Sequence, residues 1–298
     1  MSSRLDVRKT YKLYIGGKFP RSESGRSYVV TDTKGEFLAN ASRASRKDAR
    51  DAVVAARGAF SGWSGATAYN RGQVLYRVAE VMEGRAEQFA TEVAAGEGLR
   101  LTQARGVVAA AIDRWVWYAG WTDKLSQVVG GTNPVAGPYF DFSIPEPTGV
   151  VAILAPQDSS LLGLVSVLAP TLAGGNVVVA VSSKRRPLPA ITLAEAFATS
   201  DVPGGVVNLL TGGAAEIGPW LAEHADVNAI DLTGTVGGSD EAEGADAELA
   251  RDLEAKAAGT LKRVRRPSVG SPDWAAEPGL SRMTAFLETK TVWHPIGV

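Results

Sequence analysis

The sequence predicts an α/β fold built on a doubly wound parallel sheet. Residues 149–183 carry one charged side chain, Asp158, and contain two apolar runs, "GVVAIL" and "NVVVAV", on either side of an apolar segment of helix length. Uninterrupted apolar strands are typical of a parallel sheet that is buried on both faces. Strand-like and helix-like segments then alternate up to residue 235, which is the pattern of a doubly wound sheet.

Residues 149–183 are also long enough for a membrane span, which needs about 20 apolar residues. However, "APQDSS" and "APTLAGGN" interrupt the stretch with residues typical of turns and helix caps. We therefore interpret it as a strand–helix–strand unit and expect no membrane association.

The composition excludes several classes of protein. The chain has 298 residues, of which 45% are hydrophobic and 21% charged, as in an ordinary globular protein of one or two domains. Its net charge is −1, so there is no excess of basic residues that would favour binding to nucleic acid. With no cysteine and two histidines, disulfides, thiolate sites and a cysteine nucleophile are excluded, and no metal site is expected. The N-terminus shows no signal peptide, so we expect a cytoplasmic protein.

Residues 1–125 are predicted to form a hairpin followed by helices. "YKLYIGGKFPRSESGRSYVVTD" is interpreted as one hairpin that turns at Gly16-Gly17, and Ser45 is placed to cap the next helix. Two amphipathic helices are predicted in residues 69–95 and one long helix in residues 102–125. The long helix carries an aromatic cluster that we interpret as packing residues: Trp115, Trp117, Tyr118 and Trp121.

The remaining segments complete the predicted organisation. Residues 126–148 are predicted as two strands that form an arm, and residues 149–264 as the parallel-sheet part, in which the acidic segment 240–248 is a mobile loop or a helix lead-in. Residues 265–279 are rich in proline and glycine and are interpreted as a linker. Residues 280–298 are predicted as a short helix and a strand, "TKTVW".

In this order the segments resemble the NAD(P)-dependent aldehyde dehydrogenase superfamily over residues 10–264 and 280–298. The matching pieces are "YIGGKF", "ARDAVVAARGAFSGW", "WYAGWTDK", "PTGVVAILAP", "PTLAGGNVVV", "VPGGVVNLLTGG", "DLTGT", "AAGTLKRV" and "LETKTVWHPIG". The resemblance implies a Rossmann-like cofactor domain with N-terminal helices, a separate catalytic domain and a β-hairpin arm for oligomerisation. The chain is also similar to the pseudo-enzymatic second unit of tandem aldehyde dehydrogenases.

The chain departs from the family at the residues that perform catalysis. The resemblance implies a general-base glutamate in a Glu-Leu-Gly-Gly stretch after "LKRV", followed by a large domain with the nucleophilic cysteine. Here "RRPSVGSP" follows Val264, and residues 265–279 replace that catalytic domain. Asp158 stands at the position of the asparagine that helps form the oxyanion hole, and an ionised carboxylate cannot donate a hydrogen bond to an oxyanion. We therefore expect no catalytic residues.

The resemblance also places a remnant of the cofactor site. In the family a tryptophan covers the cofactor, and Gln157 stands at its position; the lysine and glutamate that hold the adenosine ribose have no counterpart in "VVVAVSS". Thr235 can meet a phosphate at a helix start, but the acidic segment after it opposes a pyrophosphate. No cofactor is expected, and NAD(P) binding is weak at most. The remnant cofactor-binding residues are Pro156, Gln157, Ser182, Gly212, Gly234 and Thr235.

Three functions remain open. The favoured one is a catalytically inactive subunit, structural or regulatory, that assembles with a full-length aldehyde dehydrogenase or with itself. The others are an NAD(P)-binding sensor and a residual NAD-dependent oxidoreductase; the last lacks nucleophile, base and oxyanion amide, each worth orders of magnitude in rate. The predicted contact is the arm, in which "TKTVW" pairs with "YFDFSI". Its oligomerisation residues are Tyr139, Phe140, Phe142, Thr291, Val292 and Trp293.

Three further motifs have a structural interpretation beside a functional one. Asp158-Ser159-Ser160 is interpreted as a helix N-cap rather than a hydrolytic group. "GGAAEIG" at 212–218 is interpreted as a strand-to-helix turn rather than a phosphate loop. The basic clusters at 184–187 and 262–267 are interpreted as solvated surface, with a site for an anionic partner as the alternative.

Overall fold

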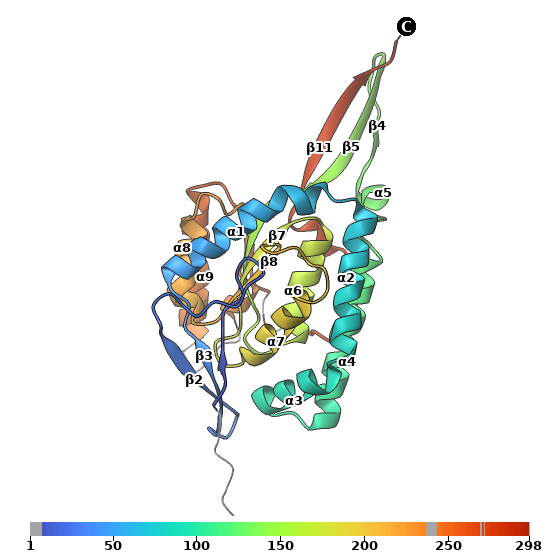
Figure 1. Ribbon diagram of the computed structural model, residues 1–298. Helices are drawn as coiled ribbons and strands as arrows, with labels where there is room; N and C mark the ends of the chain where they lie inside the picture. Colours follow the sequence, from blue (N-terminus) through green and yellow to red (C-terminus); the bar gives the residue numbers. More distant parts are fainter. Residues whose placement is uncertain (1–7, 237–242, 269, 271, 298) are drawn as a thin grey trace, which may run out of the picture.

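The computed structural model describes residues 8–236, 243–268, 270 and 272–297 of the chain. A five-stranded parallel sheet forms the centre of the molecule, with the strand order β10-β9-β6-β7-β8. Two smaller three-stranded sheets flank it, and one of these projects away from the body (Figure 1). Within the described residues, no helix combines the length and the apolar character that are needed to cross a membrane.

The central sheet confirms the predicted doubly wound topology. All four pairs of neighbouring strands are parallel, and every residue of β6 to β9 is buried, which explains their uninterrupted apolar sequence. The chain winds outward from β6 to β8 and then returns to the other side of β6, so the strand order reverses between β6 and β9. The strands are β6 (Val150–Leu154), β7 (Val177–Val181), β8 (Val207–Leu210), β9 (Ala229–Asp231) and β10 (Arg263–Arg265).

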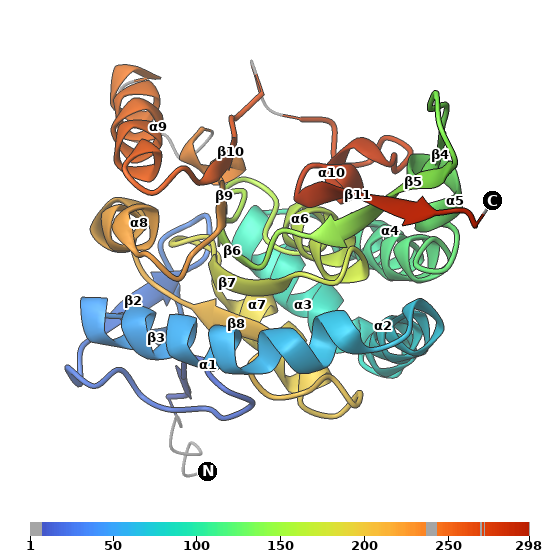
Figure 2. The ribbon, with the colours of Figure 1, turned by 90° about the horizontal axis from the view of Figure 1, so that it is seen from above.

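Helices cover both faces of this sheet. On one face α6 packs on β7 and α7 on β8, and both helices are almost entirely buried. On the other face α1 crosses β6, β7 and β8, α8 packs beside α1, and α9 packs on α8; Figure 2 shows the sheet between these helices and α6 and α7. The helices are α1 (Arg46–Gly65), α6 (Leu162–Ala173), α7 (Leu188–Phe197), α8 (Ala214–Glu223) and α9 (Glu243–Ala258).

The capping of α1 is as predicted. The Ser45 hydroxyl accepts the backbone N–H groups of Lys47 and Asp48, and the Asp48 carboxylate accepts the N–H of Ser45 at 2.7 Å. This reciprocal pair satisfies N–H groups that otherwise lack a partner at the first turn of a helix.

The prediction of one N-terminal hairpin was wrong in its pairing. Gly16 and Gly17 do form a tight turn with φ of +61° and +78°, but Tyr14 pairs with Leu209 of β8 instead of with β2. Strand β2 pairs with a strand that the sequence analysis missed, β3. Asp32 makes the turn between them by accepting two backbone N–H groups at 2.8 Å each. The strands of this sheet are β1 (Thr10–Tyr11), β2 (Ser27–Thr31) and β3 (Phe37–Ser42).

The helices between α1 and the arm agree with the predicted number. They are α2 (Ala68–Glu83), α3 (Ala86–Glu97) and α4 (Leu101–Ala119), so the long helix ends at Ala119 rather than at residue 125. The aromatic cluster packs as expected: the buried Trp115 meets Phe197 edge-on at 5.7 Å between ring centroids, and Trp117 contacts Tyr118 and Trp121.

The arm is a three-stranded antiparallel sheet in the order β11-β5-β4. Strand β11 pairs with β5 from Leu287 opposite Pro147 to Pro295 opposite Tyr139, which confirms the pairing of "TKTVW" with "YFDFSI". Residues 126–129 were predicted as strand and are helical instead. The N–H of Gly130 donates a hydrogen bond to the carbonyl of Ser126 at the end of this helix. The elements are α5 (Leu125–Val129), β4 (Gly131–Asn133), β5 (Tyr139–Pro147) and β11 (Leu287–Pro295).

Of the segment predicted as a linker, Arg265 belongs to β10, while residues 274–279 contact α4. The guanidinium of Arg114 donates to the carbonyls of Trp274 and Ala276 at 2.8 and 3.0 Å, and the Tyr118 hydroxyl donates to the carbonyl of Gly279 at 3.1 Å. The short helix α10 (Ser281–Thr284) then leads into the arm. Of the acidic segment, residues 243–248 belong to α9, while residues 240–242 lie outside the described part of the chain.

Candidate functional site

The carboxyl ends of β6, β7, β8 and β9 meet at one edge of the central sheet. Ligands of doubly wound sheets bind at this edge, where the strand order reverses, which here is between β6 and β9. The structure brings the six predicted cofactor-type residues to this edge, because each lies in the segment that directly follows one of the four strands; Gly234 and Thr235 belong to a short 3-10 helix, Thr233–Thr235. They are Pro156 after β6, Ser182 after β7, Gly212 after β8, Gly234 and Thr235 after β9, and Gln157 beside Pro156.

Gln157 ties two of these loops together. Its side-chain nitrogen donates to the carbonyl of Ala155 at 2.7 Å, and its side-chain oxygen accepts the N–H of Lys184 at 3.1 Å. Its own carbonyl accepts the Ser183 hydroxyl at 3.0 Å. The amide is therefore used within the protein and holds the loop after β7 against the loop after β6.

The start of α6 explains the "QDSS" sequence. The N-cap position of α6 is Leu161, which makes no side-chain cap, but the Ser159 hydroxyl accepts the N–H of Gly163 in the first turn at 2.9 Å. Ser160 donates from both its N–H and its hydroxyl to the Glu97 carboxylate, at 2.7 and 2.6 Å. Asp158 is half-buried, and its carbonyl accepts a hydrogen bond from the Arg186 guanidinium. Both serine hydroxyls thus have structural partners, but the prediction that Asp158-Ser159-Ser160 forms the N-cap was wrong in position, because the N-cap is Leu161.

The turn after β9 is packed directly on the end of β6. A Cβ on Gly234 would lie 1.9 Å from the carbonyl oxygen of Ala155, so only glycine fits there. The Thr235 hydroxyl is buried and donates to the carbonyl of Leu232 at 2.9 Å, so its proton is not offered to a phosphate in this structure. The predicted phosphate contact of Thr235 therefore requires this bond to break first.

Ser182 and Gly212 complete the edge. Ser182 is buried, its N–H donates to the carbonyl of Leu210, and its hydroxyl has no hydrogen-bond partner within the described residues. Gly212 has φ of +135° and lies in a three-residue turn between β8 and α8, with Gly213 as the N-cap. "GGAAEIG" is thus the strand-to-helix turn that we expected.

A buried ion cluster next to this edge was missed by the sequence analysis. Asp231, at the end of β9, has a side chain that is 2% exposed and lies 3.5 Å from the Arg282 guanidinium and 4.0 Å from that of Arg265. Burial lowers the pKa of Arg282, and the carboxylate of Asp231 acts against that shift. The three residues are far apart in sequence, so no local pattern could have indicated the cluster.

The predicted oligomerisation residues lie on both faces of the arm. Cross-strand register places Phe142 opposite Val292, with Phe140 on the same face, and their side chains form an apolar patch in which the two phenylalanine rings are 5.4 Å apart. Tyr139 and Trp293 lie on the opposite face. On that face Thr291 also shares a 2.8 Å hydrogen bond between hydroxyls with Ser143 of β5.

The described residues contain no group of three or more histidine, aspartate or glutamate side chains that could hold a metal ion. Among them, too, neither histidine lies at the carboxyl edge of the sheet, since His224 ends α8 and His294 is in the arm. The arrangement therefore offers a cofactor-type surface made of backbone groups and tightly packed glycines, with most of its polar side chains already bonded within the protein.

Comparisons with known proteins agree with this arrangement. A solved structure of an aldehyde dehydrogenase from Bacillus cereus in complex with NAD+ superposes with a TM-score of 0.78 at 27% identity, and covers 86% of this chain and 50% of that one. The structure of HpcC from Thermus thermophilus also gives a TM-score of 0.78, at 31% identity, over 86% of this chain and 47% of that one. The match therefore covers about half of each solved chain.

Sequence comparison gives the same family. Cytosolic 10-formyltetrahydrofolate dehydrogenase from mouse is 35% identical over 240 residues, which make up 78% of this chain and 26% of that protein. The mitochondrial 10-formyltetrahydrofolate dehydrogenase from human is 32% identical over 241 residues, with the same coverage. The model of the aldehyde dehydrogenase family matches residues 19–251. With this match over most of its length, the chain belongs to the aldehyde dehydrogenase family.

Proposed function

We propose that the protein is a non-catalytic member of this family that serves as a structural or regulatory subunit, and that it assembles through its arm with a full-length aldehyde dehydrogenase or with itself. The observation that carries the proposal is the three-stranded sheet that projects from the body (Figure 1). Its cross-strand register places aromatic side chains on both faces of this sheet. Tyr139, Phe140 and Trp293 are 42%, 47% and 58% exposed.

The sequence supports the absence of catalysis. The chain has no cysteine, so the family's nucleophile has no equivalent. Residues 266–280 join β10 to α10, where the family resemblance places a whole catalytic domain. Asp158 is the side chain in the loop after β6 where an amide donor is needed, and a carboxylate there opposes a developing oxyanion.

The exposed arm supports the assembly. Several hundred Å² of apolar surface left in water corresponds to several kcal/mol at about 25 cal/mol per Å², and large exposed apolar patches usually mark an interface. In the family, the arm packs on the catalytic domain of a partner. Because this chain has no such domain to offer, two copies would cover each other's arms only in part, and a full-length aldehyde dehydrogenase covers them better.

Copurification from the source organism tests this proposal. The tagged chain, expressed at its native level, is expected to retain an aldehyde dehydrogenase that mass spectrometry identifies. A variant with Phe140→Ser and Trp293→Ser should lose that partner. The matched control, Tyr69→Ser with Trp220→Ser, removes two exposed aromatic side chains from the body and should keep it. Equal retention by both variants would contradict the role of the arm.

An NAD(P)-binding sensor is the second candidate, supported by the preserved edge of the sheet and by the similarity to an NAD+ complex. The engaged side chains of Gln157 and Thr235 count against it, since neither is available to a ligand without rearrangement. Residual oxidoreductase activity has the least support, because the chain lacks a cysteine nucleophile.

A further inference from the structure

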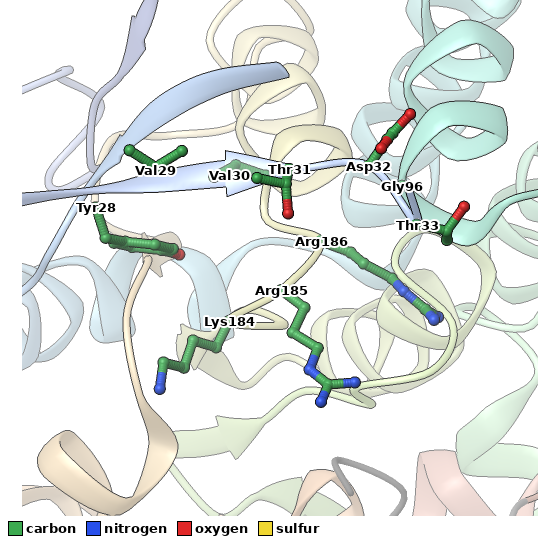
Figure 3. Close-up of a pocket in the computed structure, with 10 residues that line it drawn as sticks. All are labelled: Tyr28, Val29, Val30, Thr31, Asp32, Thr33, Gly96, Lys184, Arg185 and Arg186. Atoms are coloured by element: carbon green, nitrogen blue, oxygen red, sulfur yellow. The ribbon is translucent and has the colours of Figure 1, made fainter. Parts of the chain in front are cut away.

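Two surface pockets contain none of the six cofactor-type positions. One, of about 470 Å³, lies between β2 and the loop that follows β7, where it is lined by Lys184, Arg185 and Arg186 (Figure 3). This basic pocket adjoins the candidate site, because the Gln157 side chain there accepts the N–H of Lys184. The other pocket is separate from the candidate site and has a different chemistry.

This separate pocket lies between the start of α1 and the end of α8, and its volume is about 340 Å³. Helix α8 begins after β8, at the carboxyl edge of the sheet, and ends before β9, so its last residues lie at the opposite edge from the candidate site. The volume falls in the range of about 300–1,000 Å³ that is typical of small-molecule sites. The lining residues are Arg46, Ala49, Arg50, Trp220, Leu221, Glu223 and His224.

An arginine stacked on a tryptophan forms one wall of the pocket. The central carbon of the Arg46 guanidinium lies 3.4 Å from the centroid of the Trp220 ring. At this distance the guanidinium lies flat on the ring, so its N–H groups point outward in their own plane instead of into the indole. Arg46 makes no hydrogen bond and no ion pair with another residue of the described chain. It therefore presents a held, unoccupied fork of donors, which suits a carboxylate.

The other charged side chains of the pocket, apart from the histidine, are paired within the protein. Arg50 donates to the Asp51 carboxylate at 2.8 Å, and the Glu223 carboxylate lies 3.6 Å from the ammonium group of Lys256. Among the described residues, Arg46 is the arginine of this pocket that has no carboxylate partner. One free guanidinium matches the single charge of a carboxylate better than the larger charge of a phosphate.

Apolar surface lies directly beside this guanidinium. The Trp220 side chain is 38% exposed, and the buried Ala49 and Leu221 also line the pocket. A small carboxylate without an apolar body would leave the indole in water, whereas a flat apolar body would cover it. His224 adds a polar group: its Nδ1 accepts the N–H of Asp226 at 3.2 Å, so the neutral ring carries its proton on Nε2.

We infer that this pocket binds a small monocarboxylate with a flat apolar body, with the carboxylate on the Arg46 guanidinium and the body against Trp220. The stack of the two side chains is formed before a ligand arrives, so little entropy is lost in ordering the arginine on binding. The inference is independent of the arm, and its failure would leave the proposed assembly untouched.

Titration of the full chain with benzoate at low salt tests this inference, followed by the indole N–H resonances of the isotope-labelled protein. Trp220→Phe identifies the resonance of Trp220, which benzoate should shift until the site is saturated. Arg46→Gln is expected to weaken benzoate binding at least about tenfold, because it removes the charged fork. The matched control, Arg21→Gln, removes the same charge from an exposed arginine outside the pocket and should change the Kd less than about twofold.

Three further ligands separate the contributions of charge and ring. Acetate has the carboxylate without the ring, and benzyl alcohol has the ring without the charge, so each should bind at least about tenfold more weakly than benzoate. Phenyl phosphate has the same ring with a larger charge and should also bind more weakly, since one free guanidinium faces it.

Three results would overturn the inference: no shift of the Trp220 resonance at millimolar benzoate, an equal loss of affinity in both arginine variants, or binding of acetate or phenyl phosphate as tight as that of benzoate. The thermal unfolding midpoint of Arg46→Gln should match that of the unchanged protein, since this side chain is exposed. A loss of benzoate affinity that is confined to Arg46→Gln, with the midpoint unchanged, supports the inference.

Discussion

Tyr139 of β5 and Trp293 of β11 pack edge to face in the arm, with ring centroids 5.7 Å apart, and both stay largely exposed to water. The two side chains pack across the paired strands, yet 42% of Tyr139 and 58% of Trp293 stays exposed within the described part of the chain. Such a pair is typical of an interface whose second half lies on another molecule. The proposed role of the arm rests on this exposed surface.

Restoring the amide at position 158 should not restore catalysis. Asp158→Asn supplies a hydrogen-bond donor, but the chain still has no cysteine to attack an aldehyde. We expect both the unchanged protein and the variant to reduce NAD+ or NADP+ with small aldehydes at less than about 0.01 per second, against a typical 1–1,000 for enzymes. A rate above that value in a spectrophotometric assay would refute the non-catalytic interpretation.

Affinity for NAD+ should be low. The Gln157 amide and the Thr235 hydroxyl are bonded within the protein, so the cofactor would have to displace these contacts before gaining its own. We expect a Kd above about 1 mM, or less than about 4 kcal/mol of binding free energy. Micromolar affinity in a calorimetric titration would favour the sensor function instead.

The buried cluster around Asp231 should be important for stability. Asp231→Asn keeps an oxygen that can accept the N–H of Thr233, but it removes the charge that faces Arg265 and Arg282. Leaving these two partly buried arginines without the counter-charge of the buried Asp231 is expected to lower the free energy of unfolding by about 3 kcal/mol. Urea denaturation measures this change, and the exposed control Asp201→Asn should shift the midpoint little. Equal midpoints for the two variants would show that the cluster is not stabilising.

Glu92 should make the protein less stable as the pH rises. Burial raises the pKa of its carboxyl, although the Tyr11 and Thr192 hydroxyls donate to it at 2.8 and 2.9 Å and act in the opposite direction. A raised pKa means that the stabilising contribution is complete below the unfolded value of about 4.3 and is lost as the pH rises through the folded value. Glu92→Gln keeps the acceptor oxygen but cannot ionise. The free energy of unfolding of the variant, relative to that of the unchanged protein, should therefore increase from pH 4 to pH 7.

An opposite trend is expected for the control Glu87→Gln. The hydrogen bond from Arg105 lowers the pKa of the exposed Glu87, so this carboxylate stabilises the protein above its unfolded pKa, and the contribution is lost as the pH falls through the folded value. Thermal unfolding of both variants from pH 4 to pH 7 shows whether their stabilities, relative to the unchanged protein, change in opposite directions with pH. If the two single variants follow the same pH trend, the assignment of Glu92 is wrong.

The parallel sheet was predictable because its signal is local. Each strand is a short apolar run between turn residues, and the buried strands Val150–Leu154 and Val177–Val181 are clear examples in the sequence. The helix Leu125–Val129 was not predictable in the same way, since two adjacent valines favour a strand and the helix is five residues long. In the folded chain this helix contacts β4 and β5 of the arm.

The sequence predicted where the residues of the candidate site lie, but not which hydrogen bonds their side chains make. Strand ends place Gln157 and Thr235 at the sheet edge, and sequence order alone indicates that. Their hydrogen bonds depend on Lys184 and on the turn at Leu232, which only the folded chain brings together. The cluster of Asp231 with Arg265 and Arg282, and the basic pocket beside β2, arise in the same way from segments far apart in sequence.

The central claim, assembly through the arm, is tested most directly by light scattering coupled to size-exclusion chromatography. The purified chain is mixed with a full-length aldehyde dehydrogenase from the same organism and compared with a form that lacks residues 289–298. We expect the unchanged chain to form a hetero-oligomer and the shortened form to elute separately, with the central sheet intact by circular dichroism. If the chain is a monomer and does not bind the enzyme, with or without residues 289–298, the account is contradicted.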